Sequence, residues 1–109
     1  MKQLSTSGEL DSVFGEETAV LYKHSTHCPI SAAAHDKVEG FLAQNPDAPV
    51  YMVDVHASRD LSQSIVEKTG IEHQSPQLIL LRNGKPAWTK ARMEISAEEL
   101  AEQLQTSGT

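Results

Sequence analysis

Residues 25–31, with the sequence Ser-Thr-His-Cys-Pro-Ile-Ser, contain the single cysteine of the chain and separate two stretches of different character. The preceding residues 19–22 are apolar and are typical of a short buried strand. Over residues 30–42, apolar side chains recur with the spacing of a helix face. Pro29 suits the first position of that helix, because its missing N–H would have no partner there. The sequence therefore places Cys28 at the point where a strand leads into the N-terminus of a helix.

A position at a helix N-terminus would make Cys28 a reactive thiol. Unpaired N–H groups and the positive end of the helix dipole favour a thiolate, and they lower a cysteine pKa from about 8.5 into the range of roughly 3.5–7.5. The plain alternative is a small buried core side chain, since free cysteine is among the most often buried residue types. The polar residues 25–27 before Cys28 favour a reactive thiol, because loops at such turns tend to carry function.

Length and composition limit the class of protein. A chain of 109 residues predicts one domain, covering residues 1–109. The net charge of −6 leaves no basic field for a nucleic acid or an anionic membrane, so we expect neither as a partner. No apolar run approaches the roughly 20 residues that span a bilayer, and residues 1–5 lack the apolar core of a signal peptide. We expect a cytoplasmic protein whose disulfide chemistry is intermolecular, because one cysteine cannot form an internal disulfide.

The order of the predicted elements indicates a fold class. The patterns predict a helix over 7–14 capped by Ser7, a strand over 18–23, a helix over 30–42, a strand over 50–55, a helix over 58–69, strands over 77–82 and 86–91, and a helix starting after Ser96. The Asn83-Gly84 pair between the last two strands is a strong hairpin signal. This order predicts an α/β fold of the thioredoxin-like type, a mixed four-stranded sheet sandwiched between helices.

Residues 24–31, together with Ser75-Pro76-Gln77 and Arg82-Asn83-Gly84, resemble the monothiol bacilliredoxins, the thioredoxin-like proteins of the bacillithiol system. The resemblance spans nearly the whole chain. It implies a thiol–disulfide oxidoreductase active in oxidative stress, which removes bacillithiol from mixed disulfides on client proteins. Client proteins and bacillithiol are then the partners, and bacillithiol is a co-substrate without any resident cofactor.

The resemblance also assigns roles to individual residues. Cys28 would be the attacking thiol, and Ser31 would occupy the place where most thioredoxin-like proteins carry a second cysteine. Ser75 and Pro76 would hold the substrate backbone, and the bond between them is expected to be cis, as in thioredoxin-like folds. The chain offers no resolving cysteine, so an external thiol must release the adduct on Cys28.

Other residues near Cys28 are candidates for supporting roles. Thr26 begins the Thr-x-Cys-Pro-Ile-Ser core of the motif, and Pro29 starts the helix. The Ser31 hydroxyl is a candidate donor to the sulfur. A protonated His27 would stabilise a thiolate, although a solvated loop histidine is an equally good interpretation.

The malate carboxylates of bacillithiol would need hydrogen-bond donors close to the thiol. The candidates are the helix N–H groups, Lys23, Arg92 and a protonated His27, and the sequence does not rank them.

Three alternatives remain open beside this interpretation. A metal site would use His24, His27, Cys28 and His35, but structural zinc usually takes four ligands at stereotyped spacing, so we expect no metal. A non-catalytic binding module would dock partners around Pro76, with Trp88 as an anchor, although tryptophan is more often packed in a core. A monothiol redoxin that serves another low-molecular-weight thiol would share the same motif.

Overall fold

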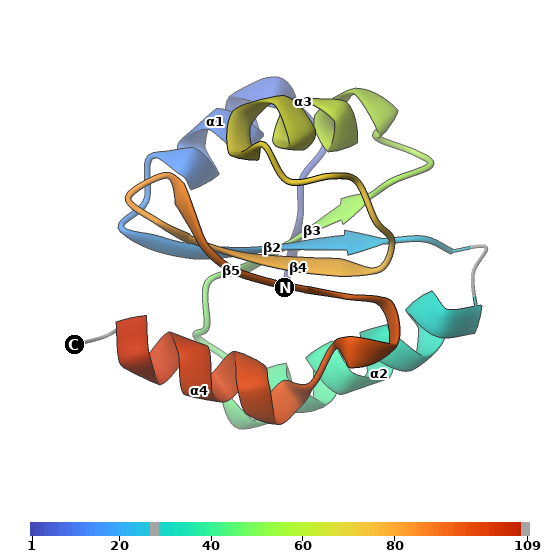
Figure 1. The fold of residues 1–109 in the computed structure, drawn as a ribbon, viewed down its shortest axis with the longest axis vertical. Helices are drawn as coiled ribbons and strands as arrows, with labels where there is room; N and C mark the ends of the chain where they lie inside the picture. The colour runs from blue at the N-terminus through green and yellow to red at the C-terminus, as the bar shows by residue number, and fades with distance from the viewer. Residues whose placement is uncertain (27–28, 108–109) are drawn as a thin grey trace.

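The computed structural model describes residues 1–26 and 29–107 of the chain (Figure 1). Within these residues one sheet holds five strands in the order β1-β3-β2-β4-β5. The strands are β1 (Lys2–Gln3), β2 (Thr18–His24), β3 (Val50–Asp54), β4 (Gln77–Arg82) and β5 (Lys85–Ala91). The first three are parallel to one another, whereas β4 is antiparallel to β2 and to β5. The sheet is therefore mixed, as predicted.

The expected count of four strands is wrong by the edge strand β1. Lys2 and Gln3 pair with Tyr51 and Met52 of β3, and both are exposed. Two polar residues show no alternation of apolar and polar side chains, so this strand leaves no signal in the sequence.

Helices cover both faces of the sheet (Figure 1). One face carries α1 (Ser7–Phe14) and α3 (Arg59–Thr69), and the other carries α2 (Pro29–Gln44) and α4 (Ala97–Ser107). A short 3-10 helix, η1 (Arg92–Glu94), connects β5 to α4. All four predicted helices are confirmed, and no helix in the described part of the chain has the length and apolar character needed to cross a membrane.

The cap of α1 differs from the prediction. Thr6, not Ser7, is the N-cap: its side chain accepts a hydrogen bond from the Glu9 N–H, and the Glu9 carboxylate accepts one from the Thr6 N–H. This reciprocal pair needs a glutamate three residues after the cap, and only Thr6 has that spacing to Glu9.

The central strand β2 divides its side chains between two hydrophobic cores. Val20 and Tyr22 pack with α2 and α4, whereas Ala19 and Leu21 pack with α1 and α3. Because side chains alternate along a strand, Lys23 lies on the α1 and α3 side, next to its register partner Gln77 on β4. The end of β2 that leads to residues 25–31 is therefore polar on this face.

The hairpin between β4 and β5 forms where the sequence predicts it. Asn83 and Gly84 both adopt positive φ angles, of 53° and 78°, as a two-residue turn of the I′ type requires. The Asn83 N–H donates to the carbonyl of Glu17 at 2.8 Å, so the hairpin also contacts the chain before β2.

Candidate functional site

The predicted reactive segment lies between β2 and α2, and the structure describes its two sides. His27 and Cys28 lie outside the described residues. Pro29 is the first residue of α2, which confirms its predicted position, and Thr26 is exposed in the turn after β2. The fully buried Ser31 accepts a hydrogen bond on Oγ from the Ser25 N–H at 3.3 Å, which ties the first turn of α2 to the end of β2. Its hydroxyl proton is not used in that bond.

The predicted substrate-binding pair Ser75-Pro76 precedes β4, and its peptide bond is cis, as predicted. Arg92 holds this loop at two points. Its N–H donates to the Pro76 carbonyl at 2.8 Å, and its Nη1 donates to the Ser75 carbonyl at 3.1 Å. Each carbonyl keeps a second lone pair for another donor. The sequence nominated Arg92 as a donor to a ligand carboxylate and gave no sign of this structural contact.

Lys23 is completely buried, although lysine is rarely found in a protein interior. Its Nζ lies 3.3 Å from His73 Nδ1, and the Ser62 Oγ lies at the same distance from that nitrogen. Burial lowers the pKa of Lys23 to about 8, and burial together with the Lys23 charge lowers the pKa of His73. The lysine that the sequence offered as a direct ligand donor thus lies behind His73.

The loop from β3 to α3 is joined to the end of β2 through His56. The Ser25 Oγ and His56 Nε2 lie 2.8 Å apart. The Asp54 carboxylate accepts hydrogen bonds from the N–H groups of His56 and Ala57, and these bonds, led by that of Ala57, lower the pKa of Asp54. The sequence does not indicate this contact, because the residues are about thirty positions apart and belong to no shared motif.

Comparison with known proteins identifies the family. The model of the family "monothiol bacilliredoxin BrxC" matches residues 2–100. The chain belongs to the monothiol bacilliredoxins. A solved structure described as a candidate oxidoreductase with a thioredoxin fold is 34% identical, with a TM-score of 0.85, over 93% of this chain and 90% of that one. Family and fold together give the chain a thiol redox role as an oxidoreductase.

Two thioredoxins show the same fold at lower identity. Thioredoxin from Fasciola hepatica is 16% identical with a TM-score of 0.75, over 98% of this chain and 99% of that chain. A thioredoxin variant from Halobacterium salinarum NRC-1 is 18% identical with a TM-score of 0.78, over 99% and 90% of the two chains. The predicted thioredoxin-like class is confirmed.

In this bacilliredoxin chain, two of the histidines considered as metal ligands form an aromatic cluster with Tyr22. The rings of His24 and His35 are 4.8 Å apart, and the Tyr22 hydroxyl lies 3.0 Å from His24 Nδ1. Burial, followed by the nearby His35, lowers the pKa of His24, while Asp54 opposes the shift. The described residues contain no group of three or more His, Cys, Asp or Glu side chains placed to hold a metal ion.

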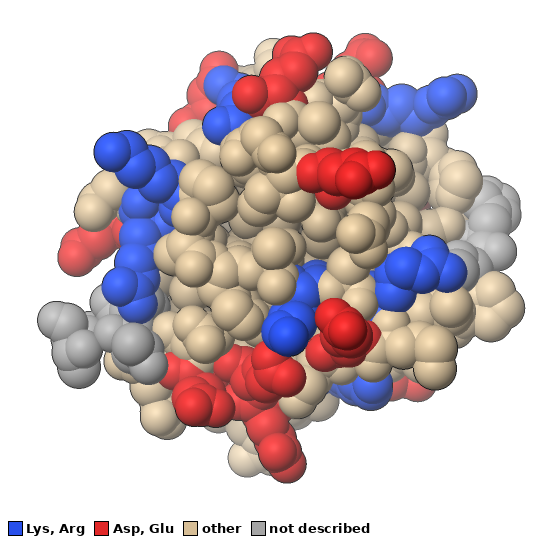
Figure 2. All heavy atoms as spheres, viewed as in Figure 1, with Lys and Arg blue, Asp and Glu red and all other residues tan. Residues whose placement is uncertain are grey.

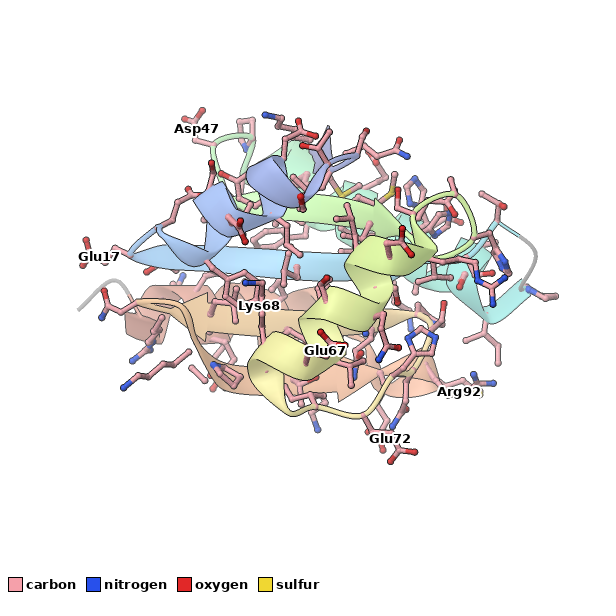
Figure 3. The ribbon with its side chains drawn as sticks, turned by 90° about the horizontal axis from the view of Figure 1, so that it is seen from above. Glu17, Asp47, Glu67, Lys68, Glu72 and Arg92 are labelled. Carbon is pink, nitrogen blue, oxygen red and sulfur yellow. The ribbon has the colours of Figure 1, made fainter. Side chains whose placement is uncertain are left out.

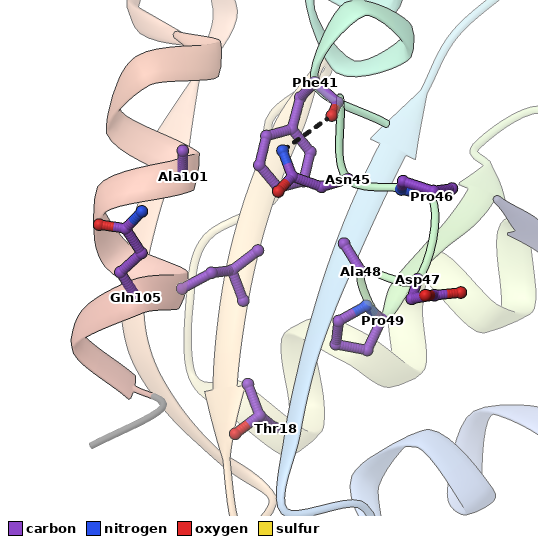
Figure 4. A pocket seen from close by; sticks show the side chains of 10 residues that line it. Thr18, Phe41, Asn45, Pro46, Asp47, Ala48, Pro49, Ala101 and Gln105 are labelled. Carbon is purple, nitrogen blue, oxygen red and sulfur yellow. Dashed lines mark hydrogen bonds between the residues drawn. The ribbon is translucent and has the colours of Figure 1, made fainter. Parts of the chain in front are cut away.

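Two further features, Trp88 and an open cavity, lie away from the reactive segment. Trp88 is partly buried against the core beneath α2 and α4, which favours a packing role over that of an exposed anchor. An open cavity of about 480 Å³ is lined by Phe41, Pro49 and Ala101 between the C-terminal halves of α2 and α4 (Figure 4). It also includes Thr18, the first residue of β2, so it lies at the opposite end of that strand from residues 25–31.

Proposed function

We propose that this chain removes bacillithiol from mixed disulfides on client proteins, with Cys28 as the attacking thiol. The observation that carries the proposal is the match of residues 2–100 to the monothiol bacilliredoxins in a chain with one cysteine. A family defined by monothiol chemistry and a chain with a single thiol point to the same residue. The 34% identical candidate oxidoreductase supports the redox class without naming the thiol.

The proposed first step is a thiol–disulfide exchange. The Cys28 thiolate attacks the bacillithiol sulfur, the bond between that sulfur and the client cysteine breaks, and a Cys28–bacillithiol disulfide forms. The client leaves as a thiolate and takes a proton from water. No net oxidation occurs, because one disulfide replaces another.

A second thiol must then restore the enzyme. Free bacillithiol attacks the adduct, which releases Cys28 as a thiolate and yields oxidised bacillithiol. Ser31 stands where a resolving cysteine would be, and its hydroxyl cannot form a disulfide. The adduct therefore persists until an external thiol arrives. The reducing cytoplasm, which we propose as the compartment of this enzyme, would supply such a thiol.

The described residues provide two aids to this exchange. The first turn of α2 starts at Pro29, and the hydroxyl proton of the buried Ser31 in that turn can be donated to a thiolate. The Ser75-Pro76 segment, held by Arg92, keeps carbonyl lone pairs with which an extended client backbone can pair.

The test follows the adduct by intact mass. The reduced protein is mixed either with a bacillithiolated client or with the same client carrying glutathione. The variant Cys28→Ser is treated in the same way in parallel. We expect the mass of bacillithiol to move from the client to the wild-type chain, with little transfer of glutathione and none to Cys28→Ser. Equal transfer of both thiols would contradict the bacillithiol assignment, and no transfer to Cys28 would contradict the exchange itself.

A further inference from the structure

A second cavity, of about 480 Å³, lies beside the N-terminal half of α3 and the segment before Ser75. We call it the basic pocket; its lining residues are Val55, His56, Arg59, Ser62, Gln63, Val66 and His73. None of these is acidic, although the chain has 15 acidic and only 9 basic residues other than histidine. On the face shown in Figure 2, acidic side chains lie over the layer of α2 and α4 and also over the layer of α1 and α3. The pocket is thus a local exception in an acidic protein.

Lys23 supplies a positive charge directly behind this pocket. It is fully buried, and its Nζ lies 3.3 Å from Nδ1 of the lining residue His73. Among the described residues, no carboxylate forms an ion pair with it. A buried cation without a counter-ion is costly unless something neutralises it, so the site is suited to receive an anion.

The contact with Lys23 also orients the donor that His73 offers. An ammonium group can only donate, so Nδ1 of His73 is the accepting nitrogen and Nε2 carries the ring proton. Arg59 adds a guanidinium group, which binds carboxylates in a two-pronged geometry. The lining also includes the Gln63 amide, which is a further N–H donor, and the apolar side chains of Val55 and Val66.

The pocket is connected to both segments that the proposed exchange uses. His56 lies 2.8 Å from the Ser25 hydroxyl, three residues before Cys28 in the sequence. His73 is two residues before Ser75. Glu72 precedes His73 in the sequence, and Arg92 contacts Ser75. Figure 3 shows both Glu72 and Arg92 at the end of the sheet away from Glu17 and Asp47. The pocket is therefore adjacent to the proposed substrate loop.

We propose that the basic pocket binds the carboxylate end of the low-molecular-weight thiol, which in bacillithiol is the malate group. The inference rests on the proposed function, since it names the site that recognises the co-substrate. Arg59 and His73 contact the carboxylates, and Lys23 acts through His73 as a positioning residue that contributes its charge.

The test uses a ligand without a thiol, the glucosamine–malate portion of bacillithiol. Its dissociation constant is measured by titration followed by NMR for the wild type, Arg59→Gln and Lys23→Met. The matched control is Lys85→Gln, which removes one positive charge from an exposed site at the β4–β5 hairpin. We expect Arg59→Gln to weaken binding about tenfold or more, Lys23→Met to weaken it several-fold, and the control to change it less than twofold.

The outcomes separate the pocket from the proposed function. Equal weakening by Arg59→Gln and Lys85→Gln would show a general charge effect and would overturn the pocket, as would shifts confined to residues outside its lining. Transfer of bacillithiol to Cys28 without binding of the probe would overturn the pocket and leave the function standing. Binding at the lining residues without transfer would support the pocket and contradict the function.

Discussion

Replacing Lys23 by methionine should stabilise the protein at neutral pH. The pKa of Lys23 is lowered from 10.5 to about 8 by burial, and each pKa unit corresponds to about 1.4 kcal/mol. The protonated side chain therefore costs about 3 kcal/mol in the folded state at pH 7. Methionine is similar in length and uncharged, but it loses the hydrogen bond to His73, worth about 1 kcal/mol. We expect the free energy of unfolding of Lys23→Met to exceed that of wild type by about 2 kcal/mol.

The lowered pKa of Lys23 also predicts the direction in which stability changes with pH. Between pH 8 and 10.5 the unfolded chain keeps a proton on Lys23 that the folded chain has lost. The stability of wild type should therefore rise with pH across this window relative to Lys23→Met. Urea unfolding of both proteins at pH 7, 8.5 and 10 gives the difference between their free energies of unfolding. The titration of groups that the two proteins share cancels in this difference.

An exposed lysine provides the control. Lys85→Met should change stability by about 0.5 kcal/mol or less at every pH, because Lys85 lies on the surface. The reasoning fails if Lys23→Met is less stable than wild type at pH 7, or if its advantage is the same at pH 7 and pH 10. A more stable Lys23→Met that binds the carboxylate probe weakly would show that the buried charge serves binding at the expense of stability.

Three further substitutions and the pH dependence of Cys28 alkylation test other features of the protein. Gly84→Ala should destabilise the protein by about 2 kcal/mol or more in urea unfolding, since φ is +78° and a Cβ would lie 2.7 Å from the Phe14 carbonyl oxygen. Gly40→Ala, in open space on α2, should instead stabilise it by about 0.5–1 kcal/mol, and equal effects of the two would contradict this. Thr6→Ala should cost about 1 kcal/mol in thermal unfolding through loss of the α1 cap, and no change in Tm would count against that cap. Alkylation of Cys28 should reach half its maximal rate well below pH 8.5, whereas a midpoint at that pH would favour an inert thiol.

The sequence by itself was sufficient for most of the fold. Apolar spacing located the helices and the strands β2 to β4, and the Asn83-Gly84 pair located the hairpin and with it β5, because these signals depend on neighbours along the chain. The cis bond of Ser75-Pro76 was predicted from the resemblance to thioredoxin-like folds, and the structure confirms it. The short edge strand β1 was missed, since its two residues form a strand only by pairing with β3.

The surroundings of the candidate site were decided by tertiary structure alone. In the sequence, Lys23 is one more residue at the end of an apolar strand, and nothing there shows that it is fully buried or that His73 contacts it from 50 residues away. The contacts of Arg92 with Ser75 and of Ser25 with His56 likewise join separate segments. Local patterns predict elements because backbone and side-chain periodicity are local. The pocket forms only when the sheet and α3 bring distant polar groups together, so its charge, donors and burial follow from packing.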